Sequence, residues 1–179
     1  MSKLLRRKEW ARRAETLSIE TRLFIDGDYR EARSGDRFET INPADSETIA
    51  SVALGDAADI DDAVASARRA FRSGAWARLE PRERMAILQR FADHIEQHAE
   101  TFALLDSLDT GKPVATALTD DVLGSVDEVR YFAEWCDKIE GIVTATRANA
   151  LHYVLRQPLG VVGAIVPWNF PLNMAITRI

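Results

Sequence analysis

The stretch "GVVGAIVPWNFPLNM", Gly160 to Met174, decides how the rest of the sequence is interpreted. Residues 161–166 are apolar on both faces, which is typical of a strand covered by helices in a parallel sheet. A parallel strand needs neighbours, and each neighbour needs a crossover connection of about a dozen residues or more. Only residues 167–179 follow, so the sequence predicts the first strand of an α/β sheet whose other strands are absent.

The segment before this strand has a different pattern. Residues 142–160, "IVTATRANALHYVLRQPLG", alternate like a two-stranded hairpin or arm. The turn is expected near Arg147-Ala148-Asn149. We therefore expect an extended arm between the helical part of the chain and the apolar strand.

The remaining sequence predicts short strands followed by four helices. Residues 22–55 read as strands joined by turns, and Asp26-Gly27 is a strong hairpin signal. The helices carry apolar residues at helical spacing and have recognisable ends. The stripe of the second helix includes Leu88 and Phe91, and that of the fourth includes Cys136 and Ile139. In chain order these signals are a cap at Asp56 or Asp59, a stop at Ser73-Gly74, Pro81 in the first turn of the second helix, a stop at Gly111 and Pro113, and a fourth helix from about Thr119 to Glu140.

Composition excludes several classes of protein. The 179 residues have a net charge of −5, which argues against nucleic-acid binding because no large basic face is available. A single cysteine, Cys136, excludes an internal disulfide and a cysteine-based zinc site, and it favours a reducing, cytoplasmic location. No apolar run reaches the ~20 residues that a membrane helix needs.

The N-terminal 22 residues are basic but lack the apolar core of a secretory signal. A transit peptide is the alternative, since such peptides are Arg-rich and amphipathic. Glu9, Glu15 and Glu20 argue against that class. We expect a surface helix with a mixed-charge face.

Asn169 is the residue with the clearest chemical potential. It lies three residues beyond Val166, and ligands of open α/β sheets bind outside the carboxyl ends of the strands. Its amide could stabilise an oxyanion on a substrate carbonyl, and Pro167 and Pro171 would restrict the backbone around it. The alternative is structural: Asn169 is a turn residue or the N-cap of a following helix.

The sequence is similar to a known family. "GVVGAIVPWNFPL" resembles the first nucleotide-domain strand of the NAD(P)-dependent aldehyde dehydrogenase superfamily. Further segments agree in order and spacing: "LFIDGDYREA", "FETINPADSETIASVALGDAADIDDAVASARRAF", "WARLEPRERMAILQRFADHIEQHAETFALLDSLDTGKP" and "VRYFAEWCDKIEG". The resemblance extends over nearly the whole chain from about Trp10. "RLFIDGDY" and "ALLDSLDTGKP" look most similar to the γ-glutamyl-γ-aminobutyraldehyde dehydrogenases.

The resemblance implies roles for named residues. Asn169 would donate to the oxyanion. A cofactor cleft for NAD or NADP would be lined, largely through backbone, by Ile165, Val166, Pro167, Trp168 and Asn169. A monovalent-cation site would use the carbonyls of Thr40 and Ile41 with Asp109, although Asp109 could equally bond local backbone. The segments that choose the aldehyde, and NAD over NADP, lie later in the family's pattern.

The resemblance also implies what is missing. The family's nucleophilic cysteine, general-base glutamate, ribose-binding lysine and glycine-rich turn all lie later than residue 179. Cys136 lies in a helical stripe and reads as a structural thiol. His94 and His98 are four apart on one helix, but the metalloprotease pattern is not met. Asp120-Asp121 are adjacent, point apart on a helix, and read as first-turn acids.

We therefore expect a partial aldehyde dehydrogenase fold in three parts. Residues 1–140 would be the N-terminal part of the NAD-binding domain, 141–158 a bridging and oligomerisation arm, and 159–179 the start of the Rossmann-like sheet. Two functions follow as hypotheses. The first is an N-terminal fragment of an aldehyde-oxidising enzyme that forms dimers or tetramers when complete, the isolated chain being inactive. The second is a non-catalytic fragment that associates with a full-length aldehyde dehydrogenase through the arm.

Overall fold

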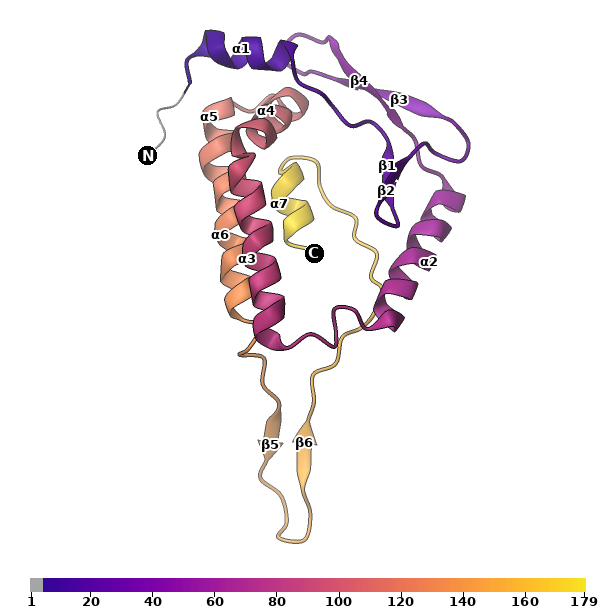
Figure 1. Cartoon of the computed structure of the whole chain (residues 1–179), viewed down its shortest axis with the longest axis vertical. Coiled ribbons are helices and arrows are strands. Elements are labelled where there is room, and N and C mark those ends of the chain that lie inside the picture. Colours follow the sequence, from indigo (N-terminus) through magenta and orange to yellow (C-terminus); the bar gives the residue numbers. More distant parts are fainter. Residues whose placement is uncertain (1–4) are drawn as a thin grey trace.

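The computed structural model describes residues 5–179, and residues 1–4 lie outside it. Helices dominate, and a long β-hairpin projects away from them (Figure 1). The helices are α1 (Arg7–Glu15), α2 (Ala57–Ser73), α3 (Pro81–Gln97), α4 (Ala99–Thr110), α5 (Val114–Thr116), the π-helix η1 (Ala117–Val122), α6 (Leu123–Glu134) and α7 (Pro171–Ile176). The strands are β1 (Leu23–Ile25), β2 (Asp28–Arg30), β3 (Arg37–Ile41), β4 (Thr48–Ala53), β5 (Ile142–Thr144) and β6 (His152–Val154).

The strands form three separate antiparallel pairs, β1–β2, β3–β4 and β5–β6. The predicted hairpin at Asp26-Gly27 is confirmed, because β1 and β2 pair on either side of it. Asp26 and Gly27 have φ values of 60° and 85°. Two successive residues in the left-handed region match the twist of the flanking strands, as in a type I′ turn.

The predicted helix ends at Asp56, Pro81 and Gly111 are also confirmed. The Asp56 carboxylate accepts hydrogen bonds from the backbone N–H of Ala58, at 2.8 Å, and of Asp59, at 3.3 Å. Pro81 opens α3, where its missing N–H costs no helical bond. Gly111 ends α4 with φ of 75°, which a residue with a side chain rarely adopts.

The hydrophobic core lies where α3, α4, η1, α6 and α7 meet. Figure 1 shows α3 and α6 side by side, and these two helices are in contact, while α7 contacts α6, η1 and α4. Small side chains dominate, so the helices approach closely. The buried cluster comprises Ala92, Ile95, Ala99, Ala103, Ala117, Val122, Val126, Val129 and Ile176.

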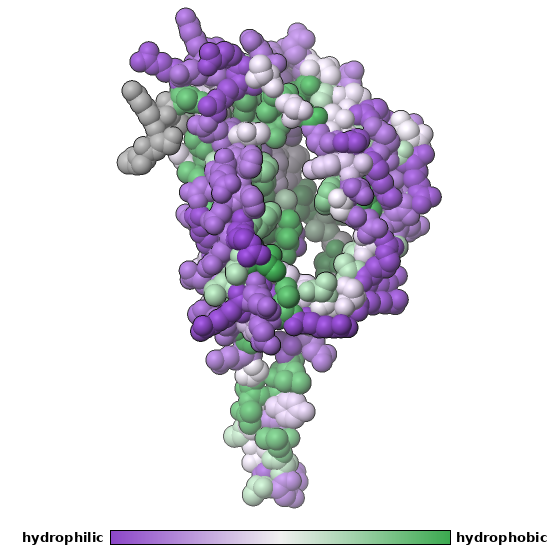
Figure 2. All heavy atoms as spheres, viewed as in Figure 1, coloured by the Kyte–Doolittle hydropathy of each residue, from purple (hydrophilic) through white to green (hydrophobic). Residues whose placement is uncertain are grey.

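The predicted arm forms as a hairpin. Ile142 pairs with Val154, and the backbone N–H of Ala150 donates to the carbonyl of Arg147 at 3.0 Å, which closes the turn where the sequence predicted it. The hairpin is isolated, and its apolar side chains are exposed (Figure 2).

Two predicted elements differ from the structure. Residues 161–166 are not a strand, because no segment among residues 5–179 pairs with them. The fourth helix was predicted from Thr119 to Glu140, but it begins as the π-helix η1 and α6 ends at Glu134. Residues 135–138 continue as turns, and Ile139, which the helical stripe included, is exposed.

The surface helix expected within the N-terminal 22 residues forms, among the described residues, over residues 7–15 only. Trp10 is buried, and Arg13 forms an ion pair with Glu100 of α4. The helix is therefore attached to the rest of the structure through one aromatic side chain and one charge pair. The part of the expected segment before residue 5 lies outside the described residues.

Candidate active-site segment around Asn169

The segment 167–170 forms the turn that precedes α7. The N-cap of α7 is Phe170, whose carbonyl accepts a hydrogen bond from the N–H of Met174 at 2.8 Å, and Pro171 occupies the first helical position. The alternative that Asn169 itself caps the helix is therefore wrong. Asn169 is an exposed turn residue, one position before the cap.

Lys112 holds this turn from another part of the chain. Its ammonium donates to the backbone carbonyl of Asn169 at 3.1 Å and lies 3.8 Å from the centre of the Phe170 ring. The same ammonium forms an ion pair with the carboxylate of Asp121 in η1. One cation thus joins a buried acid to the turn that carries Asn169.

Two buried acids lie on the inner side of Lys112. Asp121 is 2% exposed and Asp106 of α4 is 5% exposed. One carboxylate oxygen of each has no hydrogen-bond partner among the described residues. Burial, and next the charge of Asp121, raises the pKa of Asp106 to about 6. The expectation that Asp120-Asp121 are merely first-turn acids is wrong for Asp121, which is a buried ion-pair partner.

The residues expected to line a cofactor cleft form an uncovered surface. Ile165 is fully exposed, Trp168 is 77% exposed and Val166 is 40% exposed. Accessible apolar side chains of this kind can pack against a flat ring system or a covering sheet, and the cofactor-lining role of these residues stays a prediction.

The residues of the expected cation site come from two neighbouring elements. Thr40 is half-buried in β3, and Ile41 follows it with an exposed side chain. Asp109 is exposed near the end of α4. The C-terminal end of α4 approaches Pro43, just beyond β3, since a Cβ on Gly111 would lie 2.9 Å from Cγ of Pro43.

Other polar candidates have local partners. The Nδ1 of His98 lies 2.9 Å from the carbonyl oxygen of His94. Asp120 accepts a hydrogen bond from the hydroxyl of Thr119 at 2.7 Å. Cys136 is half-buried in the turn beyond α6. Within residues 5–179, His, Cys, Asp and Glu form no cluster of three or more that could hold a metal ion, and no helix is long and apolar enough to cross a membrane.

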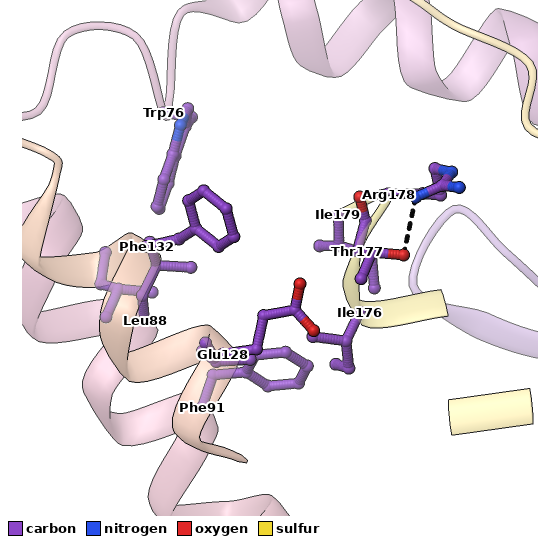
Figure 3. Close-up of a pocket in the computed structure, with 11 residues that line it drawn as sticks. Trp76, Leu88, Phe91, Glu128, Phe132, Ile176, Thr177, Arg178 and Ile179 are labelled. Atoms are coloured by element: carbon purple, nitrogen blue, oxygen red, sulfur yellow. Dashed lines mark hydrogen bonds between the residues drawn. The ribbon is translucent and has the colours of Figure 1, made fainter. Parts of the chain in front are cut away.

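An apolar cavity of about 780 Å³ lies between α3, α6 and the end of α7 (Figure 3). No pattern in the sequence indicated this cavity, although two residues that line it, Leu88 and Phe91, belong to the apolar stripe predicted for α3. Glu128 is the acid in the wall, and it accepts a hydrogen bond from the amide of Asn173 at 3.0 Å. The lining residues are Trp76, Ile87, Leu88, Phe91, Glu128, Val129, Phe132, Ile176, Thr177, Arg178 and Ile179. Figure 2 shows hydrophobic surface lining this hollow.

Comparison with known proteins gives a consistent result. Residues 29–179 match the aldehyde dehydrogenase family. The chain is 45% identical to the NADP/NAD-dependent aldehyde dehydrogenase PuuC of Escherichia coli over 170 residues, which cover 95% of this chain and 34% of that protein. It is 44% identical to the aminoacetaldehyde dehydrogenase of Pseudomonas aeruginosa over 179 residues, or 36% of that protein.

Solved structures agree with the sequence matches. A crystal structure of indole-3-acetaldehyde dehydrogenase complexed with NAD+ has a TM-score of 0.93 and 49% identity, covering 97% of this chain and 35% of that one. The γ-glutamyl-γ-aminobutyraldehyde dehydrogenase from Burkholderia cenocepacia has a TM-score of 0.91 and 44% identity, covering 94% of this chain and 34% of that one.

The fold and the sequence matches together place this chain in a class of oxidoreductases. The chain belongs to the aldehyde dehydrogenase family. It spans about a third of the length of the curated relatives it matches, and it corresponds to the N-terminal part of their fold. The predicted family and the predicted partial fold are therefore confirmed.

Proposed function

We propose that this chain is the part of an NAD(P)-dependent aldehyde dehydrogenase that supplies an oxyanion donor and one side of the cofactor cleft. The observation that carries the proposal is the position of Asn169, in a turn directly after the apolar run that ends at Val166. The similarity to a family member complexed with NAD+, over 97% of the chain, supports the cofactor.

In this proposal the side-chain amide of Asn169 donates a hydrogen bond to the substrate oxygen as negative charge develops on it. A fixed donor of this kind is worth about 2.7–4 kcal/mol of transition-state stabilisation. The backbone and side chains of Ile165, Val166, Pro167 and Trp168 hold the cofactor beside the substrate. A nicotinamide cofactor held by these residues would supply the acceptor for the hydride lost from the aldehyde carbon.

The other expected sites and domain boundaries extend the same proposal. The carbonyls of Thr40 and Ile41 with Asp109 would bind a monovalent cation, since such hard cations prefer oxygen ligands. Residues 1–140 and 159–179 would belong to the NAD-binding domain, and 141–158 would bridge subunits of a dimer or tetramer. The single unpaired cysteine favours the cytoplasm. No role with nucleic acid or membranes is proposed.

The substrate is proposed only as an aldehyde that is oxidised to a carboxylic acid. Relatives named for aminoacetaldehyde, indole-3-acetaldehyde and γ-glutamyl-γ-aminobutyraldehyde match at 44%, 49% and 44% identity. Because relatives named for three different aldehydes are similar to this chain to nearly the same degree, none of the three aldehydes is favoured as its substrate.

The test uses a chimera in which this chain replaces the matching segment of PuuC and is joined to the rest of that protein. We expect the chimera to form NADH when both an aldehyde and NAD are supplied, and we expect the 179-residue chain alone to form none. The PuuC remainder expressed alone is the matched control. A chimera that is folded and binds NAD but oxidises no aldehyde would contradict the proposal.

A second candidate function is association with a full-length aldehyde dehydrogenase without catalysis. The observation that favours it is the isolated hairpin, where Val143 and Leu151 are 71% and 75% exposed and β5 and β6 have free outer edges. Size-exclusion chromatography of the chain mixed with intact PuuC tests it. Co-elution supports this function, and separate elution at micromolar concentration counts against it.

A further inference from the structure

We propose that Lys112 is a positioning residue that fixes the turn at Pro167–Phe170, and through it the amide of Asn169. The catalytic consequence rests on the proposed function, whereas the positioning itself does not. Lys112 is 57 residues distant from Asn169 in the sequence, so the contact is purely tertiary.

The turn has few other restraints. Among residues 5–179, the Lys112 ammonium is the only donor from another element that bonds the backbone of this turn. The remaining backbone bond runs from Met174 to Phe170, within the start of α7. Trp168 is 77% exposed and therefore contributes little packing. Removal of Lys112 would leave the turn attached mainly through its own chain neighbours.

Lys112 is itself well anchored. Its side chain is 19% exposed, and that of its partner Asp121 is 1% exposed. The carboxylate is carried by η1, whose backbone is fixed in part by the hydroxyl of Ser125, which donates to the carbonyl of Asp121 at 2.6 Å. An ammonium fixed between a buried carboxylate, a carbonyl and an aromatic face has one preferred position. The cation can therefore transmit the position of η1 to the turn.

This arrangement matters because an oxyanion donor must be fixed before the reaction begins. The two prolines restrict φ at their own positions but do not restrain the turn relative to the helices. Lys112 supplies that second restraint. Its ammonium is not assigned contact with substrate or cofactor.

The direct test uses the 179-residue chain labelled with ¹⁵N-asparagine, at a concentration where light scattering shows it to be monomeric. The four probes are Asn42, Asn149, Asn169 and Asn173. We expect Lys112→Met to lower the backbone order parameter of Asn169 from about 0.85 to below about 0.6, while that of Asn42 is unchanged. The matched control is Lys138→Met, which removes an exposed lysine paired with Asp137. It should change none of the four.

A second variant keeps the lysine and removes its anchor. Asp121→Asn should also loosen Asn169, because the ammonium loses the carboxylate that holds it. Unchanged order at Asn169 in both variants would overturn the proposal. Equal loss of order at all four asparagines would overturn it too, since Lys112 would then serve general stability rather than this turn.

The catalytic consequence is tested separately in the chimera with PuuC. We expect Lys112→Met to lower kcat at least about 10-fold, since a misplaced group costs up to 10²-fold, with little change in KM. In an Asn169→Ala background the same substitution should change kcat less than about twofold, because the two residues act as one unit. Equal effects in both backgrounds would contradict a role through Asn169. If Asn169→Ala has no effect on kcat while the order parameters fall, the positioning stands and the proposed donor fails.

Discussion

Asp106 and Asp121 face a single cation, Lys112, in the interior between α4 and η1. Asp121 takes the ion pair, and the buried Oδ2 of Asp106 has no hydrogen-bond partner among residues 5–179. Burial, and next the charge of Asp121, makes the carboxyl group of Asp106 easier to protonate than an exposed one and raises its pKa from 3.8 to about 6. At neutral pH this site holds two buried carboxylates and one ammonium, so one negative charge is not balanced by the ion pair.

Asp106→Asn should reduce the pH dependence of stability. Because the folded-state pKa is raised, the folded chain binds a proton between pH 4 and 6 that the unfolded chain has released, so stability falls as pH rises through this window. Asp106→Asn has no carboxyl group to titrate at this position, so its stability should not fall in this window. After allowance for solvent screening, we expect it to gain on the order of 1 kcal/mol relative to the wild type between pH 4 and 7.

Urea unfolding at pH 4, 5.5 and 7 measures this difference. Asp106→Glu is the matched control, because it keeps a carboxyl group at this buried position and should therefore retain the fall in stability with rising pH. Parallel profiles for wild type and Asp106→Asn would show that the Asp106 carboxyl is not penalised in the folded state.

The position of Asn169 was predictable from sequence, whereas its support was not. The apolar run to Val166 and the flanking prolines placed the amide in a turn at the end of that run. Lys112 follows Gly111, which ends α4, and a lysine at such a position is usually expected to be a solvent-exposed cation. Its partners are nine and 57 residues away, and no local spacing rule connects them.

Gly111 ends α4 at the point where that helix approaches the loop after β3. Its φ of 75° is in the left-handed region, and a Cβ there would come within 2.9 Å of Cγ of Pro43. Gly124, in contrast, lies within α6, and a Cβ there would meet no atom within 4 Å. The two glycines provide a matched pair for the same substitution.

Gly111→Ala should destabilise the chain by about 1–2 kcal/mol, through backbone strain and the Pro43 contact. Gly124→Ala should stabilise it by about 0.5–1 kcal/mol, because alanine is the better helix former. Urea midpoints at one pH give both values. The account of the α4 end is wrong if Gly111→Ala is as stable as the wild type while Gly124→Ala behaves as expected.

Elements with local signals were predicted well, and elements that depend on partners were not. Asp56, Pro81 and Gly111 mark helix ends through interactions with the adjacent backbone. Residues 161–166 have the composition of a strand, but no strand among residues 5–179 lies beside them. Their backbone N–H and C=O groups therefore form no inter-strand hydrogen bonds. The end of α6 at Glu134 was missed because the apolar stripe continues to Ile139, which is exposed beyond the helix.

Apolar surface faces the solvent in several parts of the chain. It comprises the cavity beside α6, the hairpin β5–β6 and residues 161–168 (Figure 2). Val162 is 70% exposed, and Ile165 has no shielding at all. Contiguous apolar areas of this kind favour association. In the longer relatives, the remaining two-thirds of the protein is available to cover them.

The isolated 179-residue chain should bind the dye ANS in its folded state and associate as its concentration rises. Dye fluorescence and light scattering between about 1 and 100 μM measure both effects, since exposed apolar surface drives each of them. The chimera with PuuC is the control and should bind much less dye. A chain that stays monomeric, binds no dye and unfolds in one sharp transition would contradict this account of its surface.

The central claim is that Asn169 serves an aldehyde-oxidising active site, and one comparison tests it most directly. It is the kcat for NADH formation by the chimera, with Asn169 intact and with Asn169→Ala. We predict a fall of about 10²–10³-fold with KM little changed, as for loss of one oxyanion donor. A folded, NAD-binding Asn169→Ala chimera whose kcat stays within about threefold of the parent would contradict the claim.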